Sequence, residues 1–447
     1  MEHLLEILRS AQKVAEQAEV FLISSRQTPV HFEANKLKQV QSKENTSLAL
    51  RIFKEGRIGY SAASGLHLAL SLKGEGRGEG ETLLDMAMET SQFGNPANFI
   101  FPSLRDYPEV SIFDPKMEKI TVEEMIEYGN QLIAKVREYA SDILCDVEVT
   151  KGISSVHVIN SQGGEASYAK SFFGLGLEGV LIQDTDMLFV GDSESSCCLP
   201  DKLEVIADRV IRQLELAKGK AAVSTKPLPV IFTPRGVAST FLTPIAVAFN
   251  GKTVLEGASP LKDKLGKQVF DSKLSLWDDA TLAYRVKSSP CDDEGMPSQR
   301  TPLIEGGVVS NFLYDLQTAA LAGTRSTGNC RRVGGGSPKP AISSLVIDEG
   351  DISFEAMVED VTEGLVVEQL MGAEQGNLLG GDFGGNVLLG YKVRNGKIVG
   401  RVKDTMISGN IYQVLKQPLG IGNEARWVDG ILRTPVLYCP CLSVAAK

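Results

Sequence analysis

The residues of this sequence that could bind a metal or carry out acid–base chemistry are few and scattered. The four histidines are His3, His31, His67 and His157, and no two of them have the spacing of metal ligands. His157 lies in the alternating segment VHVIN, opposite its valine neighbours, which is typical of a residue on a sheet surface. A serine–histidine–aspartate arrangement remains open, but no Gly-x-Ser-x-Gly elbow marks a nucleophile. The histidines alone predict no catalytic centre.

The cysteines suggest two sites that need a structural test. One residue separates Cys439 from Cys441, whereas zinc sites usually place two to four between paired cysteines, and no histidine follows. Because the surrounding VLYCPCLSV has the pattern of a terminal strand, we expect buried free thiols there. Cys330 precedes Arg331 and Arg332, whose charges could lower the pKa of its thiol, but no histidine base is close in sequence.

Acidic clusters and glycine strings give no clearer signal. The run Asp292-Asp293-Glu294 and the pair Asp278-Asp279 are expected to be exposed turns, because neighbouring like charges repel and prefer water. The string GLGLEG, residues 174–179, lies within a strand pattern and not between a strand and a helix. The string GGGSPKP, residues 334–340, lacks the Gly-Lys-Ser/Thr ending of a P-loop. Neither string therefore predicts a phosphate site.

Composition indicates a globular protein with a sizeable core. A chain of 447 residues with 43% hydrophobic and 23% charged residues predicts two domains, or three. The net charge of −10, with no clustered basic run, argues against nucleic-acid binding. No apolar run approaches the ~18 residues of a membrane span, and the first residues have helical spacing and an acid at Glu2 in place of a secretory signal. We expect a cytoplasmic protein without a membrane segment.

The first half of the chain has the pattern of an α+β domain. Apolar residues from Leu4 to Val14 predict a helix, and Thr121-x-x-Glu124 is a capping box that predicts the start of another. Period-two alternation from Asp146 to Ser193, with a turn at Gly163-Gly164, predicts antiparallel sheet, and a further helix begins at Asp201. The glycine-rich segment 74–82 predicts a loop, with a helix from Thr82.

The second half is predicted to be rich in strands. The polar, proline-marked segment 218–229 is the expected boundary, so we predict an N-terminal domain of residues 1–222, with an antiparallel sheet and flanking helices, and a β-rich C-terminal domain of residues 223–447. Glycine pairs between alternating runs predict hairpin turns. The expected turns are Glu55-Gly56 in the first half, and Asn250-Gly251, Gly306-Gly307 and Asn395-Gly396 in the second.

An ordered set of segments resembles the TldD/PmbA family of peptidase subunits. Together with the first domain, which ends in ALRIFKEGRIGYSAAS, these segments cover most of the chain. The blocks are PCDDEG at 290–295, STGNCRR at 326–332, GLVVEQLMG at 364–372, LLGGDFGGNVLLGYKVRNGKIVGRV at 378–402 and DTMISGNIYQVL at 404–415.

The zinc motif of that family is missing. Its catalytic TldD branch carries His-Glu-x-x-x-His on a helix that opens the second domain, completed by a C-terminal cysteine. An ungapped placement on PVIFTPRGVASTFLTPIAVAF puts Thr243 and Ala248 at the histidines and Pro244 at the glutamate. None of these can bind zinc or activate its water, and no other His-Glu pair of that spacing exists in the sequence. The resemblance therefore implies the TldE, or PmbA-type, member, with no cofactor of its own.

The resemblance also implies a function and partners. The chain would be the non-catalytic subunit of a heterodimeric TldD–TldE zinc peptidase that degrades or processes unfolded peptides, the zinc being held by a partner with the His-Glu-x-x-x-His motif. The alternatives are a homodimeric scaffold or binding protein of the same fold and, least favoured, a divergent hydrolase using Cys330. Family members are also described as modulators of DNA gyrase. Positions that could line a peptide channel or an interface are Gly380, Gly381, Asp382, Phe383, Ser326, Thr327, Gly328 and Asn329.

Overall fold

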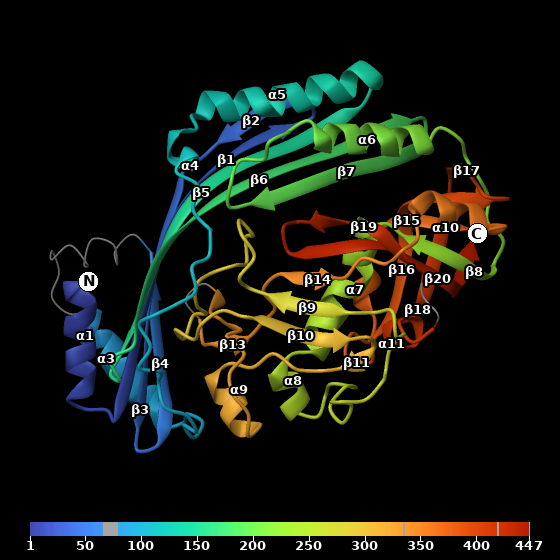
Figure 1. The fold of residues 1–447 in the computed structure, drawn as a ribbon. Coiled ribbons are helices and arrows are strands. Elements are labelled where there is room, and N and C mark those ends of the chain that lie inside the picture. The colour runs from blue at the N-terminus through green and yellow to red at the C-terminus, as the bar shows by residue number, and fades with distance from the viewer. Residues whose placement is uncertain (66–78, 334–335, 418–419, 447) are drawn as a thin grey trace.

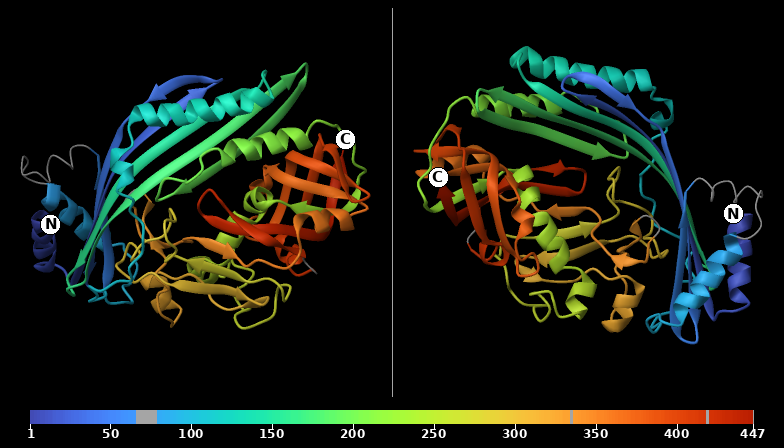
Figure 2. Two further views of the ribbon diagram at one scale, coloured as in Figure 1. Left: turned by 45° about the horizontal axis from the view of Figure 1, so that its top comes forward. Right: turned by 180° about the vertical axis from the view of Figure 1, so that it is seen from behind.

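The computed structural model describes residues 1–65, 79–333, 336–417 and 420–446. Two sheet-containing halves lie side by side, and the N-terminal helix and the C-terminus lie at opposite ends of the molecule (Figures 1 and 2). The predicted α+β class is confirmed, with an antiparallel sheet and flanking helices in the first half and strands dominating the second.

The first half is built on a seven-stranded antiparallel sheet in the order β4-β3-β1-β5-β6-β7, with β2 paired to β1. Strand β1 pairs with both β3 and β5 along most of its length, so the long central strands connect the two ends of this half. The strands are β1 Gln17–Glu33, β2 Lys36–Val40, β3 Lys43–Lys54, β4 Arg57–Ser64, β5 Leu144–Asn160, β6 Glu165–Gln183 and β7 Asp186–Ser196. The glycine string 174–179 lies within β6, as predicted.

Helices cover this sheet at two places. Helix α1 (Glu2–Gln12) packs on β1 and β5, and α3 (Glu79–Ser91) packs on β3 and β4. Helices α5 (Val122–Tyr139) and α6 (Val205–Leu216) pack on β5, β6 and β7. A short helix, α4 (Lys116–Lys119), precedes α5. The predicted capping box is confirmed, because the Thr121 side chain accepts the Glu124 amide and the Glu124 side chain accepts the Thr121 amide.

The second half contains an eleven-stranded sheet whose main path is β11-β10-β9-β14-β20-β18-β16-β15-β8. Strand β8 pairs with β15 and also with β20, so five strands close on themselves. The strands are β8 Lys226–Phe232, β9 Leu276–Asp279, β10 Arg300–Glu305, β11 Val308–Val309, β14 Leu345–Ile347, β15 Glu363–Met371, β16 Asp382–Arg394, β17 Lys397–Arg401, β18 Thr405–Asn410, β19 Gly420–Val428 and β20 Leu432–Ala446; β12 Cys330–Arg331 and β13 Lys339–Pro340 pair separately.

The helices of this half are short, apart from α7, which packs against β15 and β20. They are α7 Pro234–Ala248, α8 Gly251–Leu255, α9 Leu316–Leu321, α10 Phe354–Asp360, the 3-10 helix η2 Ala373–Gln375 and α11 Ile411–Val414. The core around α5 and α6 continues into this half through Val366, Leu389 and Tyr391. The division at residue 222 stays a prediction.

The predicted turns are confirmed with one exception. The pairs Glu55-Gly56, Gly306-Gly307 and Asn395-Gly396 all have positive φ angles between paired strands. The turn predicted at Asn250-Gly251 is wrong, because the Asn250 side chain accepts the amides of Lys252 and Thr253 and begins α8. Asparagine serves both roles, and the chain that follows decides between them. The predicted loop lies partly outside the described residues, at 74–78, and its helix begins at Glu79 and not at Thr82.

Candidate functional site

Helix α7 holds the positions at which the resemblance would place zinc ligands. It begins where the Thr233 side chain accepts the Gly236 amide and Pro234 occupies the first turn. Its inward face contains Val237, Phe241 and Ile245, spaced four residues apart and buried in the core of the second half. The helix is thus held by a cap and by apolar packing.

The three lost-ligand positions have environments that do not suit a metal. The Thr243 hydroxyl donates a hydrogen bond of 2.5 Å to Glu374 Oε1. Pro244 is buried within the helix, and Ala248 is 2% exposed in the core. A neutral hydroxyl, a pyrrolidine ring and a methyl group provide none of the imidazole or carboxylate donors that zinc prefers. The residues present therefore do not fit the zinc site of the catalytic branch.

The C-terminal cysteines lie on β20, as the strand pattern predicted. Both are free thiols. Cys439 is fully buried, and this burial raises the pKa of its thiol to about 12. Cys441 is exposed, so the expectation of a buried thiol is wrong at that position. Within the described part of the chain, no group of three or more His, Cys, Asp or Glu side chains is placed to hold a metal ion.

A buried network of charges joins the two halves. Glu294 is fully buried, and its carboxylate accepts Arg51 Nη1 at 2.6 Å and the Leu316 amide at 2.8 Å. Arg51, on β3, also donates from Nη2 to Glu19 Oε2 at 2.9 Å. Arg332 pairs with the other oxygen of Glu19. We call Glu19, Arg51, Glu294 and Arg332 the interface network; it connects β1 and β3 to loops of the second half.

The acidic run 292–294 was expected to be an exposed turn, and that expectation is wrong. Asp293 is 8% exposed and accepts the Arg332 amide at 2.6 Å, while Asp292 is fully buried. Burial and the charge of Glu294 raise the pKa of Asp292 to about 8, against the opposing effect of backbone amides that donate to it. The repulsion between these acids is offset by Arg51 and Arg332, which are distant in sequence.

Cys330 does not have the properties of a reactive cysteine. It is fully buried, and its amide donates to Asp292 Oδ2 at 2.9 Å. Burial and the negative charge of Glu294 raise the pKa of its thiol well above the ordinary value, although Arg332 acts in the opposite direction. The predicted lowering of this pKa is therefore wrong.

Asp278 and Asp279 are also buried and not exposed as expected. Asp278 accepts hydrogen bonds from the Ser343 amide at 2.7 Å, the Ser343 hydroxyl at 2.6 Å and Asn329 Nδ2 at 2.6 Å. Burial raises the pKa of Asp278 to about 6, although these donors oppose the shift. This carboxylate orders the loop that carries Asn329.

The block Ser326–Asn329 has a structural role, because its side chains hydrogen-bond the backbone of a neighbouring segment. The Thr327 hydroxyl accepts the Tyr314 amide at 2.8 Å, and the Ser326 hydroxyl donates to the Tyr314 carbonyl at 3.1 Å. Gly328 has φ +69° and lies against the Pro297 carbonyl, where a side chain would clash. A peptide contact by this block stays a prediction.

The glycine-rich start of β16 has a similar structural role. Gly381 has φ +78° and lies against the ring of Tyr412. Gly380 is part of the same corner, since its carbonyl accepts Asn410 Nδ2 at 2.7 Å. Phe383 is buried, Asp382 is exposed, and β16 pairs with β18 here and with β15 from Asn386 onward. Strand partners are therefore recorded on both sides of β16 at Asn386, and again from Tyr391 to Arg394 where β17 joins. A peptide contact at Gly380–Phe383 stays a prediction.

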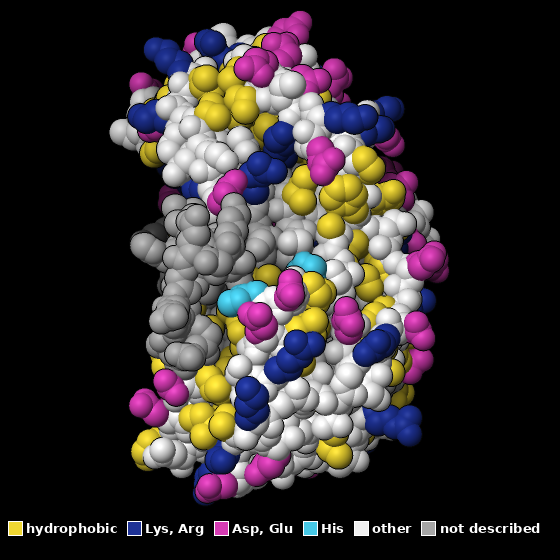
Figure 3. All heavy atoms as spheres, turned by 90° about the vertical axis from the view of Figure 1, so that its left-hand side faces the viewer, with side chains coloured by type: hydrophobic (Ala, Val, Ile, Leu, Met, Phe, Trp, Pro, Cys, Tyr) yellow, Lys and Arg dark blue, Asp and Glu magenta, His cyan; other side chains and the backbone are white. Residues whose placement is uncertain are grey.

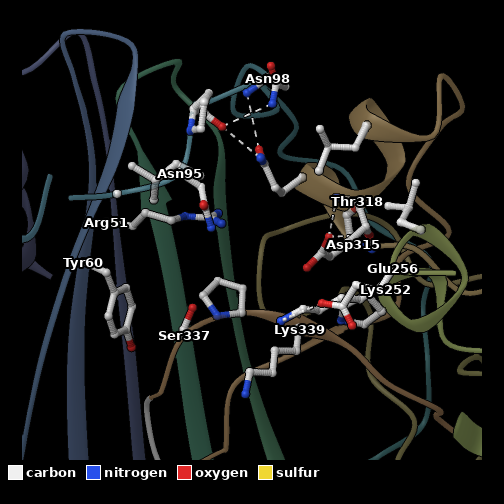
Figure 4. A pocket seen from close by; sticks show the side chains of 18 of the residues that line it. Arg51, Tyr60, Asn95, Asn98, Lys252, Glu256, Asp315, Thr318, Ser337 and Lys339 are labelled. Atoms are coloured by element: carbon white, nitrogen blue, oxygen red, sulfur yellow. Dashed lines mark hydrogen bonds and ion pairs between the residues drawn. The ribbon is translucent and has the colours of Figure 1, made fainter. Parts of the chain in front are cut away.

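A cavity of about 760 Å³ lies between the two halves, beside the interface network (Figure 4). Its N-terminal wall is formed by Arg51, by β4 and by the segment 94–98, and its opposite wall by α8, α9 and residues 337–340. The Gln317 side chain crosses between the walls, donating to the Pro96 carbonyl at 2.9 Å. No single block of the sequence indicated this cavity, because its walls come from segments about 200 residues apart.

On the face that carries α1 and α3, acidic and basic side chains are intermixed with apolar ones among the residues that the structure describes (Figure 3). His157 is half-buried on β5 and hydrogen-bonds Ser167, as expected for a sheet residue. Among the residues that the structure describes, no helix combines the length and apolar character of a transmembrane segment.

Solved structures share this fold over nearly the whole chain. TldE from Thermococcus kodakarensis aligns with a TM-score of 0.86 at 22% identity, covering 99% of each chain. A proposed modulator of a DNA gyrase from Thermotoga maritima aligns with a TM-score of 0.87 at 21% identity, covering 99% of this chain and 100% of the other. These likenesses define the fold class.

Sequence comparison defines the family. Profiles of the PmbA/TldA metallopeptidase domain 1, central domain and C-terminal domain match residues 18–75, 115–217 and 225–446. An uncharacterized protein of Methanocaldococcus jannaschii is 25% identical over 430 residues, 94% of each chain. The metalloprotease PmbA of Escherichia coli O157:H7 is 27% identical over 355 residues, 76% of this chain and 74% of its own. The chain belongs to the PmbA/TldD family.

Proposed function

We propose that this chain is a metal-free, non-catalytic subunit of a two-subunit peptidase, whose zinc is held by a partner of the same family with the His-Glu-x-x-x-His motif. The pair would process or degrade unfolded peptides, and this chain would form part of the chamber wall and limit entry to extended chains. The chain itself would need no cofactor. This assignment combines family membership with the environment of helix α7.

The environment of α7 carries the proposal. Pro244 and Ala248 are packed into the core, and Thr243 is bonded to Glu374, so these positions contribute to folding in place of chemistry. Even if a conformational change exposed these three side chains to a metal ion, they would offer it no imidazole or carboxylate ligand. The high pKa and full burial of Cys330 also argue against a cysteine hydrolase built on the same fold.

Co-expression with the nearest paralogue that carries His-Glu-x-x-x-His tests the proposal. We expect the two chains to co-purify, zinc to be present at one ion per pair, and peptide cleavage to require both. Changing the glutamate of the paralogue's motif to glutamine abolishes cleavage, whereas Thr243→Ala in this chain leaves it unchanged. Cleavage by the isolated chain with stoichiometric zinc contradicts the proposal. Self-association without binding to the paralogue favours the homodimeric scaffold instead.

A further inference from the structure

The cavity between the halves has the features of a ligand site that the lost metal motif does not explain. A volume of about 760 Å³ lies within the ~300–1,000 Å³ range of small-molecule sites. Its walls come from both halves and combine apolar side chains with a few polar groups. Figure 4 shows Arg51 and Tyr60 on one wall and Lys252, Glu256 and Asp315 on the other. The kind of ligand follows from the charges and donors.

One donor on the cavity wall lacks a partner. Arg51 is 3% exposed, and its two terminal nitrogens bond Glu294 and Glu19, but its Nε has no hydrogen-bond partner in the described structure. The guanidinium lies 5.1 Å from the ring centre of Phe99 and 4.9 Å from that of Phe101, so it is held rigidly. A buried N–H donor without a partner is costly, so a small shift of this wall that exposed Nε to a ligand acceptor would be favoured.

Two exposed lysines add positive charge at the opposite wall. Lys339 has no carboxylate within 4.0 Å among the described residues, and Lys252 has only Glu256, at 3.8 Å between exposed side chains. Such an exposed pair is worth little, so a ligand carboxylate can replace Glu256. The other acid of the wall, Asp315, already accepts the Thr318 amide and hydroxyl as the cap of α9. The charged groups that remain available to a ligand are the two lysines, so the cavity favours an anion.

The remaining lining groups suit a peptide. Asn95, Asn98 and Gln317 carry side-chain amides that can bond a peptide backbone. Asn98 Nδ2 and Gln317 Nε2 already donate to the Pro96 carbonyl, so a peptide would use the second N–H of each and the amide of Asn95. Ile58 on one wall and Leu321 on the other provide apolar surface for a side chain. We infer that this cavity binds the carboxyl-terminal end of a short peptide with an apolar last residue, its carboxylate held by Lys252 and Lys339. This inference rests on the proposed function, since it names the end of the peptide that this subunit recognises.

Fluorescence anisotropy with the isolated full chain tests the inference. The probe is fluorescein-Gly-Ser-Gly-Ala-Leu, prepared as the free acid and as the carboxamide. We expect the free acid to bind at least about tenfold more tightly, because the amide loses the charge-assisted contacts. The double variant Lys252→Met/Lys339→Met reduces free-acid binding to the level of the amide. The matched control Lys264→Met/Lys273→Met, at exposed lysines outside the cavity lining, leaves it unchanged.

Removing the carboxylate of Glu256, which competes for Lys252, should strengthen peptide binding where the lysine variants weaken it. Glu256→Gln tightens free-acid binding by about twofold, because Lys252 no longer has an intramolecular partner. Equal binding of acid and amide, no effect of the lysine double variant, or no binding at all would each overturn the inference. These outcomes leave co-purification and zinc content of the two-subunit peptidase unaffected. Conversely, lack of a catalytic partner does not alter peptide binding by this chain, so the two proposals fail separately.

Discussion

Replacement of Arg51 by methionine is the sharpest test of how the two halves are held together. Arg51 donates to Glu19 on β1 and to Glu294 in the second half, and all three side chains are at most 3% exposed. Arg51→Met keeps much of the apolar stem but leaves Glu294 with the Leu316 amide as its recorded partner. Breaking a buried ion pair from one side costs about 3–5 kcal/mol, because the remaining charge stays desolvated. We expect this loss in the free energy of unfolding.

Urea denaturation measures the loss, which corresponds to a midpoint lower by about 1 M. Both tryptophans, Trp277 and Trp427, lie in the second half, whereas circular dichroism reports on both halves. If the interface network couples the halves, the two signals coincide in the wild type and separate in Arg51→Met. The control Arg325→Met removes an exposed arginine and should change stability by less than about 0.5 kcal/mol.

A double-mutant cycle identifies the origin of the effect. Glu294→Gln removes the charge but keeps an oxygen that can accept the Leu316 amide, so Arg51→Met/Glu294→Gln should be more stable than Arg51→Met. We expect a coupling energy of at least about 1 kcal/mol. The reasoning is refuted if Arg51→Met costs no more than the Arg325→Met control, or if Glu294→Gln makes the Arg51→Met protein still less stable.

Three further predictions concern single positions. Because burial raises the pKa of Asp278 to about 6 from an unfolded value near 4, the native state binds its proton more tightly, and this group lowers stability as pH rises from about 4 to 6. Asp278→Asn should therefore lose that part of the pH slope in denaturation experiments, and an unchanged slope contradicts the assignment. Ala248→His should destabilise the protein by about 1–3 kcal/mol, measured in urea, because a ring cannot fit into the packed core. In native thiol titration the exposed Cys441 should react fast and Cys330 should not; Cys441→Ser should remove the fast phase.

Local rules predicted the parts of the fold that depend on neighbouring residues. The Thr121 capping box and the turn at Asn395-Gly396 follow from hydrogen bonds and φ angles within a few residues. The strand across the glycine string 174–179 follows from period-two alternation. Asn250-Gly251 shows the limit of such rules, because asparagine suits both a tight turn and a helix N-cap.

The candidate site depends on contacts that no local rule contains. Arg51 and Glu294 are 243 residues apart, so the partner that allows an acidic run to be buried is invisible in its own segment. The rule that adjacent acids repel is sound, but it predicts exposure only when no counter-charge is supplied from elsewhere. Charged residues in a segment shared with a family, such as PCDDEG, are therefore weak evidence for solvent exposure.

The fold does not depend on a His-Glu-x-x-x-His motif, which the sequence lacks, for one physical reason. Metal binding contributes folding energy when the ligands would otherwise be unpaired, as in small zinc domains. In this chain the apolar face of α7 packs into a large core, and a separate set of buried ion pairs links the halves. Neither interaction requires a metal ligand at Thr243, Pro244 or Ala248, so zinc-binding side chains can be absent there without removing what holds the structure together. This separation is what the proposed non-catalytic subunit would need.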